Sequence, residues 1–124
     1  MAKKTVLVVD DEKNVRRLVR NLLGEEYIVL EARNGEVAID VARNEKPDLI
    51  LMDVFMPRMD GYTACCALKE DRATKAIPLI MITGDGMQLN RKLTLELGAD
   101  GYITKPLSSE ELMDTIGRFL ESRQ

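Results

Sequence analysis

Short apolar runs alternate along this chain with segments in which apolar residues recur every three or four positions. An unbroken apolar run is typical of a strand buried on both faces, and the wider spacing is typical of an amphipathic helix. The pattern predicts strands over residues 5–9, 27–31, 49–52, 79–82 and 101–104. It predicts helices over residues 13–23, 36–44, 61–70 and 87–97, and a last helix that the capping-box pattern Ser108-Ser109-Glu110-Glu111 opens.

A single helix follows each predicted strand, as in a parallel sheet. Parallel strands need right-handed crossover connections, which divide the helices over both faces of the sheet. We therefore expect an α/β, doubly wound (βα)5 fold with a five-stranded parallel sheet. A unit of this size suits the flavodoxin-like strand order 2-1-3-4-5. Since 124 residues is about the length of one domain, residues 1–124 are expected to form a single domain.

Polar residues stand where the predicted strands end. Asp10 and Asp11 follow the first strand, Asp53 the third, Thr83 the fourth and Lys105 the fifth. Each has an ordinary explanation, such as a helix cap or a solvated lysine. In open parallel sheets, however, ligands bind outside these strand ends, so the residues are expected to converge. Two carboxylates ~4 Å apart repel by about 4 kcal/mol at an effective dielectric of ~20. A divalent cation relieves that repulsion, and an all-oxygen site suits magnesium.

Composition narrows the class of protein. A charged content of 31% and a hydrophobic content of 45% are those of a soluble globular domain. The net charge of −3, without a cluster of Lys and Arg, argues against nucleic-acid binding. No apolar run nears the ~18 residues that span a bilayer, and no signal-peptide cleavage site follows the start, so a cytoplasmic protein without membrane contact is expected. Cys65 and Cys66 are adjacent, so reduced thiols are expected.

Four motifs resemble those of response-regulator receiver domains, in particular chemotaxis-regulator-like ones, which are the phosphoacceptor modules of bacterial two-component signalling. The motifs occur in the family's order over essentially the whole chain: Val8-Val9-Asp10-Asp11-Glu12, Leu51-Met52-Asp53 with Met56-Pro57 and Met59-Asp60-Gly61, Ile82-Thr83-Gly84, and Gly98-Ala99-Asp100-Gly101-Tyr102-Ile103-Thr104-Lys105-Pro106.

The resemblance implies that Asp53 accepts a phosphoryl group in the presence of magnesium. Asp11 and Asp53 would bind the ion directly, Asp10 would act mainly through water, and the backbone carbonyl of Phe55 would complete the protein ligands. The bulky Phe55 and the charged Asp85 stand at positions that influence the lifetime of the phosphoryl group in this family. The rate of dephosphorylation is therefore open.

The resemblance also implies a switch. Lys105 would pair with the phosphoryl group, Thr83 would move to donate a hydrogen bond to it, and Tyr102 would rotate in response. The peptide between Lys105 and Pro106 would be cis. Such a domain catalyses only its own phosphotransfer and slow autodephosphorylation, so it is not an enzyme that acts on other substrates.

The expected partners follow from the same chemistry. The chain contains no histidine, so the phosphoryl donor would be a sensor histidine kinase or a histidine phosphotransfer protein. An unknown output partner, or a weak homodimer in place of a monomer, would use the predicted helix over 87–97, the strand over 101–104 and the last helix. Leu95 is either an isolated surface leucine or part of this partner surface.

Three other classes of protein fit the sequence less well. A haloacid-dehalogenase-type phosphatase would need a second Asp where Phe55 stands. A nucleotide-binding module would need a phosphate-binding glycine motif, and neither G-x-x-x-x-G-K-[ST] nor G-x-G-x-x-G occurs. A pseudo-receiver that has lost phosphorylation would not be expected to keep all the site residues.

Overall fold

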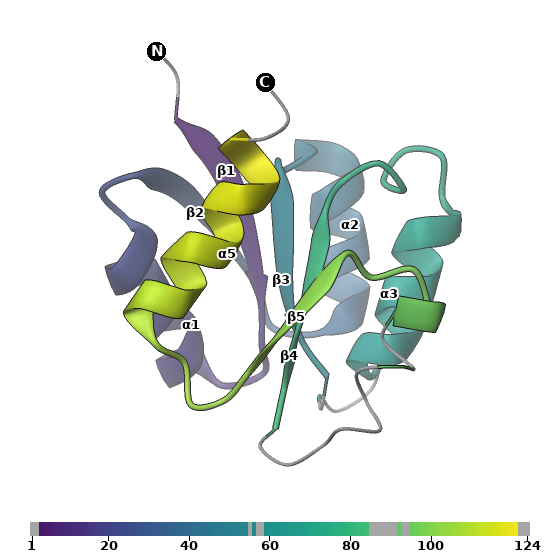
Figure 1. Cartoon of the computed structure of the whole chain (residues 1–124). Helices are drawn as coiled ribbons and strands as arrows, with labels where there is room; N and C mark the ends of the chain where they lie inside the picture. The colour runs from purple at the N-terminus through teal and green to yellow at the C-terminus, as the bar shows by residue number, and fades with distance from the viewer. Residues whose placement is uncertain (1–2, 55, 57–58, 85–91, 93–94, 122–124) are drawn as a thin grey trace.

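The computed structural model describes residues 3–54, 56, 59–84, 92 and 95–121 of the chain. Its strands are β1 (Lys4–Val9), β2 (Tyr27–Ala32), β3 (Leu49–Asp53), β4 (Leu79–Thr83) and β5 (Gly101–Thr104). Its helices are α1 (Lys13–Leu23), α2 (Gly35–Glu45), α3 (Gly61–Glu70) and α5 (Ser109–Glu121). All strand pairs are parallel, and the order is β2-β1-β3-β4-β5, so the predicted fold and strand order are confirmed (Figure 1).

The five strands and the helices α1, α2 and α3 begin and end within one residue of their predicted positions, because the apolar pattern reports burial directly. Every residue of β3 and β4 is buried, which explains the unbroken apolar runs. The helix predicted over 87–97 lies mostly outside the described residues. Among the described residues, no helix is long and apolar enough to cross a membrane.

Helices cover both faces of the sheet, and each face has its own apolar layer. Figure 1 shows α5 in front of the sheet and α2 behind it. Behind the sheet the packed helix residues come from α2 and α3, namely Ala38, Ala42, Ala64, Cys65 and Leu68. In front they come from α1 and α5, namely Val19, Leu23, Leu112, Ile116 and Leu120. Both cysteines are free, as predicted, and burial raises the pKa of Cys65 to about 11.

Side-chain caps fix where the helices begin after the loops at the carboxyl ends of the strands. Oδ1 of Asn34 accepts a hydrogen bond from the N–H of Val37 at 2.9 Å, and Oδ1 of Asp60 accepts one from the N–H of Thr63 at 2.8 Å. Each such cap stabilises a helix by about 1 kcal/mol. Ser108 caps the last helix through its hydroxyl, as the capping-box pattern predicts. Because all the strands are parallel, their carboxyl ends share one edge of the sheet.

Candidate functional site

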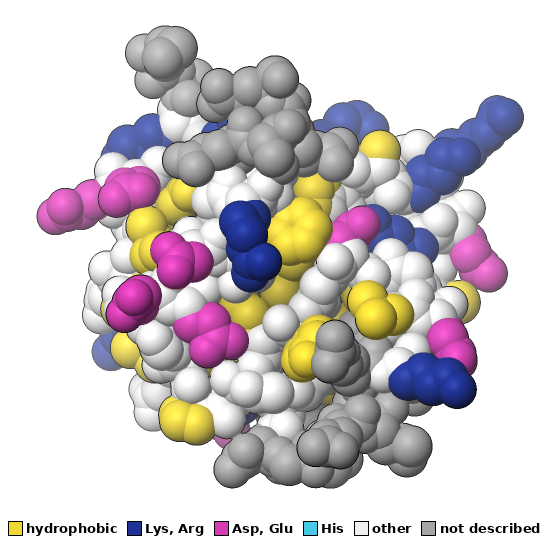
Figure 2. Space-filling view, viewed as in Figure 1, with side chains coloured by type: hydrophobic (Ala, Val, Ile, Leu, Met, Phe, Trp, Pro, Cys, Tyr) yellow, Lys and Arg dark blue, Asp and Glu magenta, His cyan; other side chains and the backbone are white. Residues whose placement is uncertain are grey.

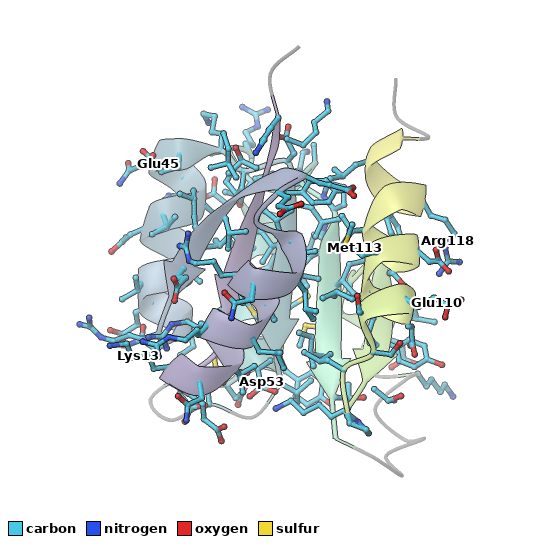
Figure 3. The ribbon with its side chains drawn as sticks, turned by 90° about the vertical axis from the view of Figure 1, so that its left-hand side faces the viewer. Lys13, Glu45, Asp53, Glu110, Met113 and Arg118 are labelled. Atoms are coloured by element: carbon cyan, nitrogen blue, oxygen red, sulfur yellow. The ribbon has the colours of Figure 1, made fainter. Side chains whose placement is uncertain are left out.

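The sheet brings the three predicted carboxylates together. Asp10 follows β1, Asp53 ends β3, and the two strands are neighbours in which Val9 pairs with Met52. The next residue on each strand is therefore one of the two aspartates. Ligand oxygens of Asp10, Asp11 and Asp53, here called the carboxylate cluster, all lie within 4.8 Å of one another. Figure 3 views the sheet edge-on and places Asp53 at the edge where the strands end, far from Glu45 at the end of α2.

Asp10 is held tightly and is electrostatically strained. Its N–H donates to the carbonyl of Ala32 at 3.1 Å, and its Oδ1 accepts from the N–H of Glu12 at 2.9 Å. Its Oδ2 is buried and has no hydrogen-bond partner among the described residues. Burial, together with the charges of Asp53 and Asp11, raises the pKa of Asp10 to about 6. A buried carboxylate oxygen without a partner is what a bound cation would satisfy.

Lys105 supplies a positive charge to the carboxylate cluster. Its Nζ lies 3.2 Å from Oδ1 of Asp53 and 3.9 Å from Oδ2 of Asp10. The pKa of Asp53 is raised, chiefly by burial and also by the charge of Asp11, although the charge and hydrogen bond of Lys105 oppose the rise. Partial burial alone would lower the pKa of Lys105, but the charge and hydrogen bond of Asp53, together with the charges of Asp10 and Glu12, outweigh it, and that pKa is raised. One ammonium beside three carboxylates leaves the site with an excess of negative charge, which a bound metal ion would neutralise.

Thr83 and Tyr102 lie on β4 and β5, the two strands that follow β3 in the sheet. Thr83 ends β4, is buried and pairs in register with Thr104 of β5. Its carbonyl accepts a hydrogen bond from the N–H of Lys105 at 2.8 Å, which ties the ends of β4 and β5 together. Tyr102 of β5 is half-buried against the apolar layer of α2 and α3. The peptide between Lys105 and Pro106 is cis, as the resemblance implied.

A close backbone contact holds the segment after Asp53 against the start of α3. The N–H of Gly61 donates to the carbonyl of Val54 at 2.8 Å. A Cβ added to Gly61 would lie 2.8 Å from the Cα of Val54 and would collide with the carbonyl of Asp53. Only glycine allows this approach without a shift of the backbone. Phe55, whose carbonyl is predicted to bind magnesium, lies outside the described residues.

Two arginines of α1 connect the site to the edge strand β2, and the sequence analysis did not identify them. Nη1 of Arg16 donates to the carbonyl of Asp10 at 2.7 Å, and its Nε donates to Oε1 of Glu31 at 3.0 Å. Arg20 donates to Oε2 of Glu31 at 2.8 Å and to the carbonyl of Val29 at 2.9 Å. Their spacing of four residues places both arginines on one helix face, and this spacing could have predicted that they share a partner.

A cleft of about 940 Å³ lies elsewhere, along α5. It is lined by Glu26 from the turn before β2, by Tyr27 at the start of β2, and by α5 residues that include Met113 and Arg118. Figure 2 views the molecule from the side of α5 and shows acidic side chains gathered beside this helix. None of the predicted site residues that the structure describes lines the cleft. The polar groups that converge are at the strand ends, so we place the chemistry there.

Comparisons with known proteins identify the family of the chain. The response regulator receiver domain family matches residues 6–117. Histidine kinase P4 of Formosa agariphila is 40% identical over 121 residues, which cover 98% of this chain and 9% of the kinase. The chain also spans less than half the length of the transcriptional regulators that match it.

Two solved structures show the same architecture. The chemotaxis protein CheY4 of Vibrio cholerae has a TM-score of 0.90 and 32% identity, over 96% of this chain and 100% of that one. The receiver domain of the sensor histidine kinase PA1611 of Pseudomonas aeruginosa PAO1 has a TM-score of 0.88 and 27% identity, over 97% of this chain and 99% of that one. That structure has a magnesium ion coordinated in its active site cleft. The match over residues 6–117 shows that the chain belongs to the response regulator receiver domain family of two-component signalling.

Proposed function

We propose that this domain is a phosphoacceptor switch in which Asp53 receives the phosphoryl group. The observation that carries the proposal is the meeting of Asp53 with Asp10, Asp11 and Lys105 at one edge of the sheet. A carboxylate oxygen of Asp53 attacks the phosphorus of a phosphohistidine. The P–O bond forms as the P–N bond breaks, and the histidine nitrogen leaves with the electron pair. The donor is a sensor histidine kinase or a histidine phosphotransfer protein, since this chain has no histidine.

The carboxylate cluster fits magnesium. Asp10, Asp11 and Asp53 offer only oxygen ligands, and Oδ2 of Asp10, which accepts no hydrogen bond from the described residues, would be available to a bound cation. The carbonyl of Phe55 would be a further ligand. When bound, the ion neutralises charge on the transferring phosphoryl oxygens. Lys105 lies 3.2 Å from Asp53 already, so its ammonium would pair with the phosphoryl group after a small movement.

The switch begins at Thr83 and ends at the surface. The hydroxyl of Thr83 would donate a hydrogen bond to a phosphoryl oxygen on Asp53. Tyr102, on the strand next to that of Thr83, would then move into the space that Thr83 leaves. Moving a two-state equilibrium from 1:99 to 99:1 takes about 5.5 kcal/mol. Two or three hydrogen bonds to charged groups, at about 1.5–3 kcal/mol each, are sufficient for that.

The output of this proposed switch is a change in the surface of β5, α5 and the helix predicted over 87–97. An output partner, or a second copy in a weak homodimer, would bind this surface. Leu95 is 51% exposed and fits both an isolated surface leucine and a contact on that surface. The domain would be a cytoplasmic regulator that catalyses only its own phosphotransfer and a slow autodephosphorylation.

Acetyl phosphate tests the central assignment. With magnesium present, intact-mass measurement should find one added phosphoryl group on the wild-type chain. Asp53→Asn should abolish the addition, because an amide cannot form the acyl phosphate. Asp60→Asn is the matched control, since Asp60 is exposed and its role is to cap α3. Equal labelling of Asp53→Asn and wild type would place the nucleophile elsewhere.

A further inference from the structure

Arg16 has no part in the proposed phosphoryl chemistry, yet it is bonded directly to the backbone of the carboxylate cluster. Its side chain is 15% exposed, and its Nη1 donates to the carbonyl of Asp10 at 2.7 Å. That carbonyl belongs to the peptide that joins Asp10 to Asp11. Because the peptide unit is planar, fixing its oxygen fixes the plane of the whole unit. The hydrogen bond therefore limits the directions in which Asp11 can leave the strand end.

Asp11 needs such a constraint. Asp10 is held by its own side chain and its N–H, through Glu12 and Ala32. Asp11 is exposed, and its carboxylate takes part in no hydrogen bond with the described residues. Its placement beside Asp53 within the carboxylate cluster therefore depends on the backbone that carries it.

Glu31 anchors Arg16 at its other end. Glu31 lies on the edge strand, in register with Val8 of β1, and its Oε1 accepts from Nε of Arg16. Its second oxygen is held by Arg20, which also donates to the carbonyl of Val29. Charge-assisted hydrogen bonds of this kind fix geometry as well as adding energy. With its Nε held on Glu31, the Arg16 guanidinium presents Nη1 to Asp10 in a fixed direction.

We propose that Arg16 is a positioning residue for the magnesium site: anchored on Glu31, it fixes the Asp10–Asp11 peptide so that both carboxylates face Asp53. The inference rests on the proposed function, because it concerns the site at which that function would bind its ion. Groups that orient metal ligands without touching the metal themselves change metal affinity by roughly 10–100-fold when they are removed.

The test compares two arginines that share one anchor. Magnesium affinity is measured by calorimetry for wild type, Arg16→Met and Arg20→Met. Arg16→Met should bind magnesium about 10-fold more weakly, at the lower end of the range for such contacts. Arg20→Met loses its bonds to Glu31 and Val29 but leaves the bond to the Asp10 carbonyl, so its affinity should stay near that of wild type. Arg16→Lys should lie between, because one ammonium cannot bridge both acceptors in the same geometry.

Hydrogen exchange without metal separates this inference from the proposed function. The N–H of Glu12 is bonded to Asp10, so its exchange rate reports how firmly Asp10 is held. Exchange at Glu12 should be faster in Arg16→Met than in Arg20→Met.

Wild-type affinity with unchanged exchange in Arg16→Met would overturn the inference, and so would an equal loss of affinity in both variants. If Arg16→Met does not fold, Arg16→Lys decides by the same two measurements. If wild type itself binds no magnesium, the proposed function fails, and exchange at Glu12 still decides whether Arg16 positions Asp10.

Discussion

Lys105 and Asp53 meet across an intervening strand: Nζ and Oδ1 are 3.2 Å apart, although β4 lies between β3 and β5. The same ammonium is 3.9 Å from Oδ2 of Asp10. The partly exposed ammonium of Lys105 therefore offsets the charge of two buried carboxylates at once. The charge balance of the site depends on this side chain whenever no divalent cation is bound.

Lys105→Met should destabilise the metal-free protein. Because Lys105 is partly exposed and screened by solvent, we expect the free energy of unfolding to fall by only about 1 kcal/mol. The loss should be smaller with saturating magnesium, which replaces the missing positive charge. Urea denaturation with and without a chelator measures both values. Lys13→Met, at an exposed position on α1, is the control and should change stability by less than about 0.5 kcal/mol.

The raised pKa of Asp10 predicts a stability that falls with pH. The pKa is 3.8 for an ordinary Asp and about 6 in the folded protein, so the folded state holds this proton more tightly than the unfolded state. The resulting stability is fully present below about pH 4 and is lost as the pH rises through 6. At 1.36 kcal/mol per pH unit this amounts to about 3 kcal/mol. Without metal, wild type should lose stability relative to Asp10→Asn between pH 4 and 7. A constant difference between the two proteins across this range would contradict the prediction.

Magnesium should raise the melting temperature, because it binds the folded state and relieves repulsion within the carboxylate cluster. At about 100 times the dissociation constant the gain is about 2.7 kcal/mol. Asp11→Ala should lose most of this response and gain stability without metal. Asp40→Ala removes an exposed carboxylate of α2 and should respond like wild type. Equal responses from all three proteins would mean that the carboxylates do not form the binding site.

Gly61→Ala should distort the segment that carries Asp53. The added Cβ meets backbone atoms of Asp53 and Val54, which cannot move aside like the end of a flexible side chain. Overpacking of this kind costs about 1–3 kcal/mol, and the rate of phosphorylation should fall as well. Gly84→Ala is the matched control, because no heavy atom of the described residues, apart from Gly84 itself and its chain neighbours, lies within 4 Å of its added Cβ. Chemical denaturation and acetyl phosphate labelling of both variants check the prediction, which fails if the two behave alike.

Thr83→Ala should separate phosphorylation from signalling. The variant keeps Asp53 and the carboxylate cluster, so it should still accept a phosphoryl group. Without the hydroxyl at the end of β4, the response at Tyr102 should be weak. Chemical-shift changes at Tyr102 and Leu95 on addition of beryllofluoride, a phosphoryl mimic, measure the response. Identical shifts in wild type and Thr83→Ala would show that Thr83 does not transmit the signal.

The sequence predicts the fold well because each face of each element is recorded in its apolar spacing. The same rule predicts the strand ends, and with them the meeting of Asp10, Asp53 and Lys105. It does not predict Arg16, because a hydrogen bond from a side chain to a backbone carbonyl depends on how closely α1 approaches the end of β1. Nor does it predict that Oδ2 of Asp10 lacks a hydrogen-bond partner among the described residues, because that is a property of the packing around one atom.

The order of the strands has a consequence for folding. Asp10 and Asp53 come from the neighbouring strands β1 and β3, which are separated in sequence by α1, β2 and α2. The carboxylate cluster therefore exists only after these intervening elements have closed into place. A bound divalent cation would oppose every local opening that parts β1 from β3, so amide protons along both strands should become protected together. In this way the bound ion would couple β1 and β3, so that the two strands open as one cooperative unit.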